Sequence, residues 1–156
     1  MNMVQARIVV DADACPVKRE IVEAARIAEA EVVMVASYDH RLEALDRVSI
    51  VQVDRSDQSV DLYIANHLRA GDILVTQDFG LATIGLAKRS IVLSNRGQRY
   101  TDQTIGFLLE SRHESAKRRR NGKHSKGPKP FTDDDRRSFL QSLTKVLHDL
   151  QENTSI

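Results

Sequence analysis

The sequence predicts an α/β fold of three layers, in which helices cover both faces of a mainly parallel, five-stranded sheet. Two observations support this prediction. Short and nearly continuous apolar runs are typical of parallel strands that are buried on both faces. Between these runs, apolar residues recur at helical spacing, and the connections are short. If the sheet is doubly wound in the order 3-2-1-4-5, the first and fourth strands are neighbours at the switch point.

Five apolar runs predict the strands. They cover residues 4–10, 32–36, 49–53, 73–76 and 91–93. Pro16 is expected to open the first helix, because proline suits the first helical position. Ser56 or Asp57 is a suitable N-cap for a second helix, which Gly71 ends. A short third helix precedes the fifth strand, and residues 39–47 are expected to form either a short helix or a loop.

The balance of charge changes along the chain. Residues 1–94 contain 10 Lys/Arg and 14 Asp/Glu, whereas residues 95–156 contain 13 and 8. We expect a single domain over residues 1–156, built from four parts. These are an α/β core (1–95), a helical connection (96–111), a basic flexible loop (112–130) and a C-terminal helix (131–150) that packs back on the core. Residues 132–135 resemble a capping box at the start of that helix.

The composition excludes several classes of protein. A hydrophobic fraction of 41% is enough for a core, and the 4% of aromatic residues make that core aliphatic. No apolar run of 18 residues is present, so neither a transmembrane helix nor a membrane partner is expected. A secretory signal is not expected either. Cys15 is the only cysteine, which excludes an internal disulfide and favours a cytoplasmic location.

Acidic residues follow two of the predicted strands. Asp11 follows the first strand and Asp78 the fourth, while Asp61 lies near the start of the helix before the fourth strand. Neighbouring strands lie about 4.8 Å apart, so carboxylates at their ends can share one cation. Mg²⁺ takes oxygen ligands and keeps several waters, so it needs only a few carboxylates. Taken singly, each of these acids, and Asp13 as well, is more simply explained as a solvated or helix-capping residue.

Other polar residues near these strand ends are candidates for phosphate contacts. Lys18 lies one helical turn beyond the first acids. It is expected either to bind a phosphate or to be an ordinary solvated lysine on the helix surface. Thr76 and Gln77 follow the fourth strand and are placed to orient a water or a phosphate. Cys15 is expected to be a small buried thiol, because a cysteine phosphatase loop needs arginine where Ile21 stands.

Basic residues gather in the second half of the chain. Those expected to contact phosphates are Arg96, Arg99, Arg118, Arg119, Arg120 and Lys123. Such contacts release counterions, so binding should depend on salt. A run of charge is also explained as solvated surface, but the clustering of these residues and the glycines within the tract favour contact with nucleic acid or phosphate.

Four motifs resemble those of the YaiI/YqxD family of bacterial proteins. They are Asp11-Ala-Asp13-Ala-Cys-Pro16-Val-Lys18, Val60-Asp61-Leu-Tyr-Ile64, Gly71-Asp72-Ile-Leu-Val-Thr76-Gln77-Asp78-Phe79-Gly80-Leu81-Ala82, and Gly127-Pro128 before Phe131-Thr132. The resemblance implies a fold like the PIN-like group of metal-dependent nucleases. It also implies an acidic cluster of Asp11, Asp61 and Asp78, with Asp13 beside it, that binds Mg²⁺ or Mn²⁺ for phosphodiester hydrolysis. PIN-type sites commonly carry a further acid after the helix that follows strand four, whereas residues 81–89 contain none.

Three functions are compatible with these residues. The first is a metal-dependent nuclease that acts on RNA rather than DNA, with the basic segment holding the strand. The second is a phosphatase of the haloacid dehalogenase type, with Asp11 as nucleophile and Asp13 as acid. That fold needs a later acid directly after a strand, whereas Asp72 precedes one. The third is a non-catalytic nucleic-acid or nucleotide binding protein.

Overall fold

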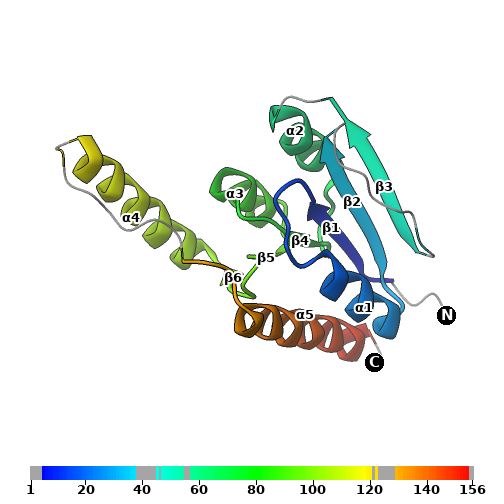
Figure 1. The fold of residues 1–156 in the computed structure, drawn as a ribbon. Helices are drawn as coiled ribbons and strands as arrows, with labels where there is room; N and C mark the ends of the chain where they lie inside the picture. Colours follow the sequence, from blue (N-terminus) through cyan, green and yellow to red (C-terminus); the bar gives the residue numbers. More distant parts are fainter. Residues whose placement is uncertain are drawn as a thin grey trace.

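Figure 1 shows the computed structural model, in which residues 5–37, 45, 47–54, 57–120, 122 and 129–154 are described. Within these residues a six-stranded sheet has the order β3-β2-β1-β4-β5-β6. Its strands are β1 (Arg7–Asp11), β2 (Glu31–Ser37), β3 (Val48–Val53), β4 (Ile73–Val75), β5 (Ile91–Leu93) and β6 (Arg99–Tyr100). β1 to β5 are parallel, and β6 pairs antiparallel with β5. The predicted class and the order 3-2-1-4-5 are confirmed, with one short strand added at the edge.

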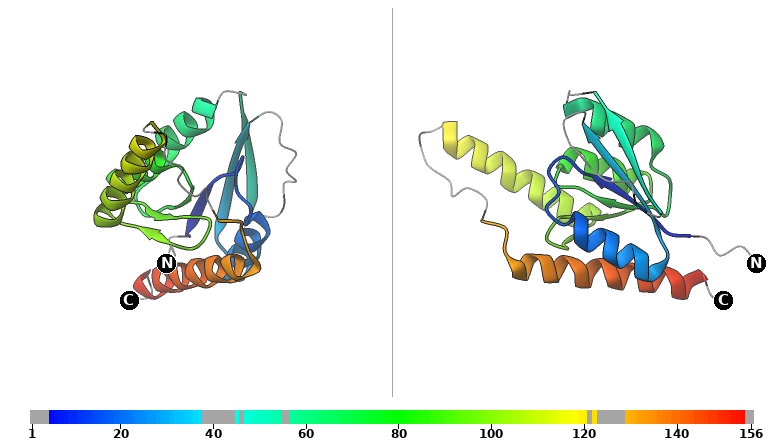
Figure 2. Two further views of the ribbon diagram at one scale, coloured as in Figure 1. Left: turned by 60° about the vertical axis from the view of Figure 1, so that its left-hand side comes forward. Right: turned by 45° about the vertical axis from the view of Figure 1, so that its right-hand side comes forward.

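Helices lie on both faces of the sheet and give the predicted three layers (Figures 1 and 2). They are α1 (Lys18–Ala28), α2 (Asp57–His67), α3 (Phe79–Ala87), α4 (Asp102–Arg120) and α5 (Asp133–Thr154). Alternate residues of β1 face opposite layers. Ile8 and Val10 pack in the cluster with α1 and α5, whereas Val9 packs in the cluster with α2 and α3. None of the described helices has the length and apolar character that crossing a membrane requires.

The C-terminal helix α5 packs back on the core against α1, as predicted (Figure 2). The buried residues of its apolar stripe are Phe139, Leu143, Val146 and Leu147. The predicted capping box is present at its start. Thr132 Oγ1 accepts from the Asp135 N–H at 3.1 Å, while Asp135 Oδ2 accepts from the Thr132 N–H at 2.9 Å. The helix continues to Thr154, beyond its predicted end.

The structure differs from the prediction between residues 96 and 130. Residues 99–100 form β6 instead of part of a helical connection, and α4 continues to Arg120. The prediction of a flexible loop is therefore wrong for residues 112–120. Lys and Arg are good helix formers, and they fill the last turn of α4, where cations are favourable. Of residues 121–130, only 122, 129 and 130 are described, and the rest of that predicted loop lies outside the described residues.

The ends of two helices also differ from the prediction. Pro16 was predicted to open the first helix, but it belongs to a turn, and α1 begins two residues later at Lys18. α2 contains Asp57 as its first residue, whereas the alternative cap, Ser56, lies outside the described residues. Most of the segment 39–47 also lies outside them.

Candidate functional site

The carboxyl ends of β1 and β4, which lie side by side in Figure 1, meet at the switch point of the sheet. Val10 pairs with Val75, so Asp11 stands level with Thr76, the residue after β4. The buried Thr76 hydroxyl donates to Asp11 Oδ2 at 3.0 Å and accepts from the Asp78 N–H at 3.0 Å. The structure thus brings Asp11 and Asp78 to one edge, as the topology predicted, and connects them through one hydroxyl.

Asp78 also begins α3. Its Oδ1 accepts from the Leu81 N–H at 2.9 Å, which makes Asp78 the N-cap of the helix. The side chain is nevertheless exposed, so capping does not remove its charge from solvent. Asp78 therefore has the structural role that the capping explanation predicted and still presents a carboxylate at the sheet edge.

Asp13 and Asp61 have other surroundings. Asp13 Oδ1 accepts from the Ser37 N–H at 2.8 Å, which ties the loop after β1 to the end of β2. Asp61 is half-buried in α2. In the part of the chain that the structure describes, no group of three or more His, Cys, Asp or Glu side chains is arranged to hold a metal ion. Metal binding therefore stays a prediction for Asp11, Asp13, Asp61 and Asp78.

A buried asparagine that the sequence reasoning missed joins three loops at this edge. Asn95, which is 5% exposed, lies just after β5. Its Nδ2 donates to the Ala14 carbonyl at 3.1 Å, and its N–H donates to Gln77 Oε1 at 2.8 Å. The loops after β1, β4 and β5 are thereby connected. Gln77, predicted to orient a water or a phosphate, uses its amide oxygen in this connection. The sequence feature that could have indicated this role of Asn95 is the polar pair Ser94-Asn95 directly after a buried strand.

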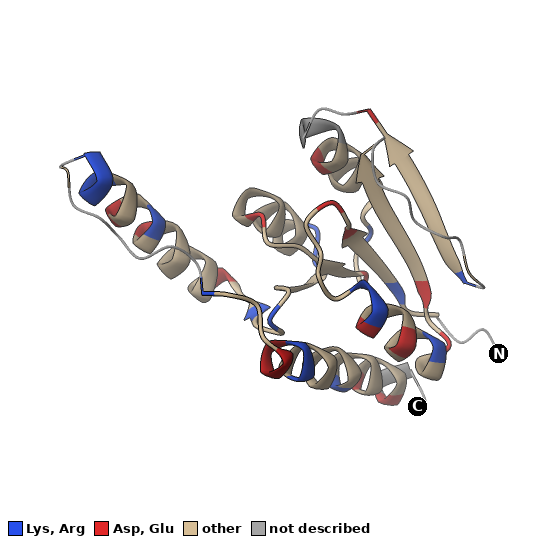
Figure 3. Cartoon of the chain, in the orientation of Figure 1, with Lys and Arg blue, Asp and Glu red and all other residues tan. Residues whose placement is uncertain are grey.

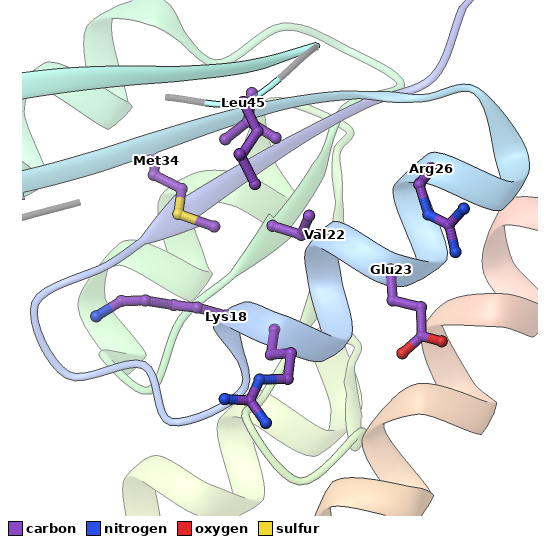
Figure 4. A pocket seen from close by; sticks show the side chains of 8 residues that line it. Lys18, Val22, Glu23, Arg26, Met34 and Leu45 are labelled. Atoms are coloured by element: carbon purple, nitrogen blue, oxygen red, sulfur yellow. The ribbon is translucent and has the colours of Figure 1, made fainter. Parts of the chain in front are cut away.

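Cys15 is a buried thiol, as predicted. Burial raises its pKa from 9.0 to about 11, while the charge of Lys18 lowers it and that of Asp11 raises it. Both charges therefore lie near this thiol. Lys18 begins α1, is half-buried, and extends beside a cavity of about 400 Å³ between α1 and the sheet, which Val22 and Met34 also line (Figure 4).

Cys15 is expected to react slowly with iodoacetamide in the native protein. Only the thiolate is nucleophilic. A pKa of about 11 instead of 9.0 lowers the thiolate fraction near pH 8 roughly 100-fold. Alkylation followed by mass spectrometry should therefore become faster by at least that factor when urea unfolds the chain at the same pH. Similar rates in the two conditions would contradict the buried thiol.

A sequence profile described as "Uncharacterized BCR, YaiI/YqxD family" matches residues 9–149. The chain belongs to the YaiI/YqxD family. A UPF0178 protein of Bacillus velezensis is 49% identical over 148 residues, which cover 94% of this chain and 88% of the relative. A UPF0178 protein of Listeria monocytogenes is 45% identical over 141 residues, which cover 90% and 95%. No solved structure matches the chain, so the PIN-like fold stays a prediction.

In this YaiI/YqxD protein, Arg96 is engaged within the fold. Its Nη1 binds Asp135 Oδ2 at 2.5 Å, and its Nη2 donates to the Lys129 carbonyl at 2.6 Å. The guanidinium also lies 5.5 Å from the centre of the Phe131 ring. A phosphate contact by Arg96 would have to replace these interactions, whereas Arg99 is exposed in β6.

The start of α5 contacts the loops at the acidic edge, by which we mean the carboxyl edge of the sheet that carries Asp11 and Asp78. Arg136 lies 5.1 Å from the centre of the Phe131 ring and donates to the Pro16 carbonyl in the loop after β1. Gly97 has a φ of +84°, and a Cβ there would lie 2.7 Å from the Ser138 carbonyl oxygen. Glycine therefore lets the turn after β5 approach α5 closely.

The basic residues of α4 lie at its tip and in its middle. Those of the exposed last turn are Lys117, Arg118, Arg119 and Arg120 (Figure 3). Lys123 lies outside the described residues. In the middle of the helix, the Arg112 guanidinium lies 5.8 Å from the centre of the Phe79 ring, and Phe79 directly follows Asp78. Phe79 packs edge-on against Tyr100, whose pKa is raised by burial and by the charge of Asp78.

Proposed function

We propose that this YaiI/YqxD protein hydrolyses phosphodiester bonds of RNA with Mg²⁺ or Mn²⁺ as its cofactor. The observation that carries the proposal is the Thr76 hydroxyl, which is bound both to Asp11 and to the backbone of Asp78. Ligands of open α/β sheets bind outside the carboxyl ends of the strands, at the switch point. Two carboxylates at that point, both at least partly exposed, are suited to a divalent cation, which could in turn bind a phosphate oxygen.

The donor set at this edge fits a hard divalent cation. Asp11 and Asp78 offer only oxygen ligands, which Mg²⁺ and Mn²⁺ prefer. Mg²⁺ keeps several waters, so two carboxylates with water and substrate oxygens suffice. A group of three ligands, which the described residues lack, is not required. Asp13 and Asp61, which the described structure does not group with these two carboxylates, are not needed for this two-carboxylate site. When bound, the ion would polarise the phosphate and acidify a water.

The side chains of the protein are proposed to position the substrate. The Thr76 hydrogen bond fixes one oxygen of Asp11 and so orients that carboxylate. Lys18, near the same edge, is proposed to bind a phosphate oxygen through a charge-assisted hydrogen bond. The last turn of α4 offers positive charge to the rest of the strand. RNA, rather than DNA, is the proposed nucleic acid.

The phosphatase alternative is weakened by the place of Asp72. This residue precedes β4 and is ion-paired with Arg7, at the edge opposite the one where Asp11 ends β1. A non-catalytic nucleic-acid or nucleotide binding protein remains the second candidate. One observation favours it: the carboxylates of Asp13 and Asp78 already accept backbone hydrogen bonds.

Cleavage of RNA is expected to require the metal. A labelled single-stranded RNA should be shortened in Mg²⁺ or Mn²⁺, and the rate should fall at least about 100-fold in excess EDTA, because the metal supplies the charge that activates the phosphate. Adding the ion back should restore the rate. Fluorescence anisotropy with the same RNA measures binding separately. RNA that binds in a salt-dependent manner but stays intact with either ion would refute the hydrolase and support the binding protein.

A further inference from the structure

The contact between Arg112 and Phe79 has no part in the hydrolysis proposed above. The Arg112 guanidinium lies 5.8 Å from the centre of the Phe79 ring, and Phe79 is the residue after Asp78. We propose that Arg112 and Phe79 form a stacking platform for one base of a single-stranded nucleic acid whose backbone passes Asp78. The platform rests on the proposed function only in taking nucleic acid as the ligand.

Phe79 is held in a fixed position. Its ring meets that of the buried Tyr100 edge-on, with a centroid separation of 6.0 Å and an interplanar angle of 78°. Such edge-to-face pairs are favourable at this separation. Phe79 is also the first residue of α3, whose N-cap is Asp78. The ring therefore keeps a constant position relative to the acidic edge, as a stacking partner must.

Arg112 adds a planar cation to this ring. The residue is exposed on α4, so its guanidinium is accessible to a ligand while it lies over Phe79. Bases of single-stranded RNA stack on aromatic side chains and on guanidinium planes. Such stacking tolerates any base, because every base has a π-face. The platform therefore favours single strands without strict sequence preference.

The platform also connects the two charged parts of the surface. Arg119, in the last turn of α4, lies seven residues beyond Arg112, which is about 10 Å along a helix. A strand whose phosphates contact this last turn can therefore reach the platform and then Asp78. This gives α4, which projects from the body in Figures 1 and 3, a role in guiding one strand to the acidic edge.

The test uses a short single-stranded RNA that carries 2-aminopurine, whose fluorescence falls when the base stacks. The full chain is titrated in EDTA, so that metal-dependent cleavage is suppressed. Arg112→Lys keeps the charge but loses the planar group, and Arg26→Lys, at an exposed arginine in the last turn of α1, is the matched control. We expect Arg112→Lys to abolish the quenching at saturation and to raise the Kd roughly tenfold. Arg26→Lys should keep the quenching and change the Kd less than about twofold.

The outcomes separate the platform from the hydrolysis. Equal quenching with the wild type and Arg112→Lys overturns the platform, and so does a wild type that does not bind the RNA. Phe79→Leu is a second variant that should lose the quenching, with thermal melting as the check on its fold. Quenching without metal-dependent cleavage refutes the hydrolysis alone. Cleavage together with quenching that survives Arg112→Lys refutes the platform alone.

Discussion

Asp11→Asn is expected to lower the rate of RNA cleavage roughly 100-fold or more while leaving the fold unchanged, because even groups that only orient metal ligands change activity by about 10–100-fold. Asparagine keeps an oxygen that can accept from Thr76 Oγ1, so the 3.0 Å hydrogen bond at Asp11 survives. Only the negative charge is lost. The initial rate in Mg²⁺ measures the effect, and circular dichroism with thermal melting shows that the protein is folded.

Asp78→Asn is expected to give a comparable loss through the other carboxylate. Asparagine is as good an N-cap as aspartate, so the hydrogen bond from the Leu81 N–H is kept. Asp78→Ala should lose activity as well, and it should also lower the free energy of unfolding by about 1 kcal/mol, because the cap is gone. Comparing the two variants separates the charge of Asp78 from its structural role.

Asp149→Asn is the matched control for both substitutions, because Asp149 is an exposed acid on α5. It should leave the cleavage rate unchanged and alter the free energy of unfolding by less than about 0.5 kcal/mol. RNA binding in anisotropy should persist in all of these variants. Cleavage that survives both Asp11→Asn and Asp78→Asn would show that these carboxylates do not take part in the reaction.

The fold was predictable where burial decides it. Parallel strands covered on both faces need continuous apolar runs, and these revealed β1 to β5. Their order followed from taking the sheet to be doubly wound. β6 was missed because its two residues carry no pattern of their own. Residues 112–120 were misread because their composition predicts little burial. A helix also depends on intrinsic propensity and on charge at its end, and the basic residues there satisfy both conditions.

The candidate site was predictable only where topology decides it. Asp11 and Asp78 follow neighbouring parallel strands, so the sheet order alone brings them to one edge. The contacts of Asp13 with Ser37 and of Asn95 with Ala14 depend on the paths of loops. No periodicity in the sequence encodes those paths. Arg96 likewise looked like a free cation, because its partner Asp135 is far along the chain.

Asp72→Asn is expected to act on stability instead of catalysis, lowering the free energy of unfolding by about 3 kcal/mol. Asp72 accepts from Arg7 Nε and Nη2 and from the Arg69 N–H. The side chains of Arg7 and Asp72 are 16% and 8% exposed, so little water screens the pair. Asparagine cannot balance the guanidinium charge, which stays largely shielded from water. The figure is the lower end of the usual range, because Arg7 also donates to the His67 carbonyl.

Two further variants test that explanation. Asp134→Asn breaks the ion pair with Arg137, whose side chains are 82% and 72% exposed, and serves as the control. It should leave the free energy of unfolding almost unchanged, because exposed pairs contribute little. Arg7→Met combined with Asp72→Leu should recover much of the lost stability, because no unpaired charge is left buried.

Asp72→Asn should therefore lower stability and keep the cleavage rate, whereas Asp11→Asn should lower the cleavage rate and keep stability. A loss of about 3 kcal/mol should lower the Tm of Asp72→Asn by roughly 6–12 °C for a chain of this size. Its folded molecules should cleave RNA at the normal rate, because Asp72 precedes β4 and lies at the edge opposite Asp11. Urea titration gives the stability, and cleavage measured well below the unfolding transition gives the rate. A stable but inactive Asp72→Asn would place the chemistry at the amino edge of the sheet, against the assignment of Asp11 and Asp78.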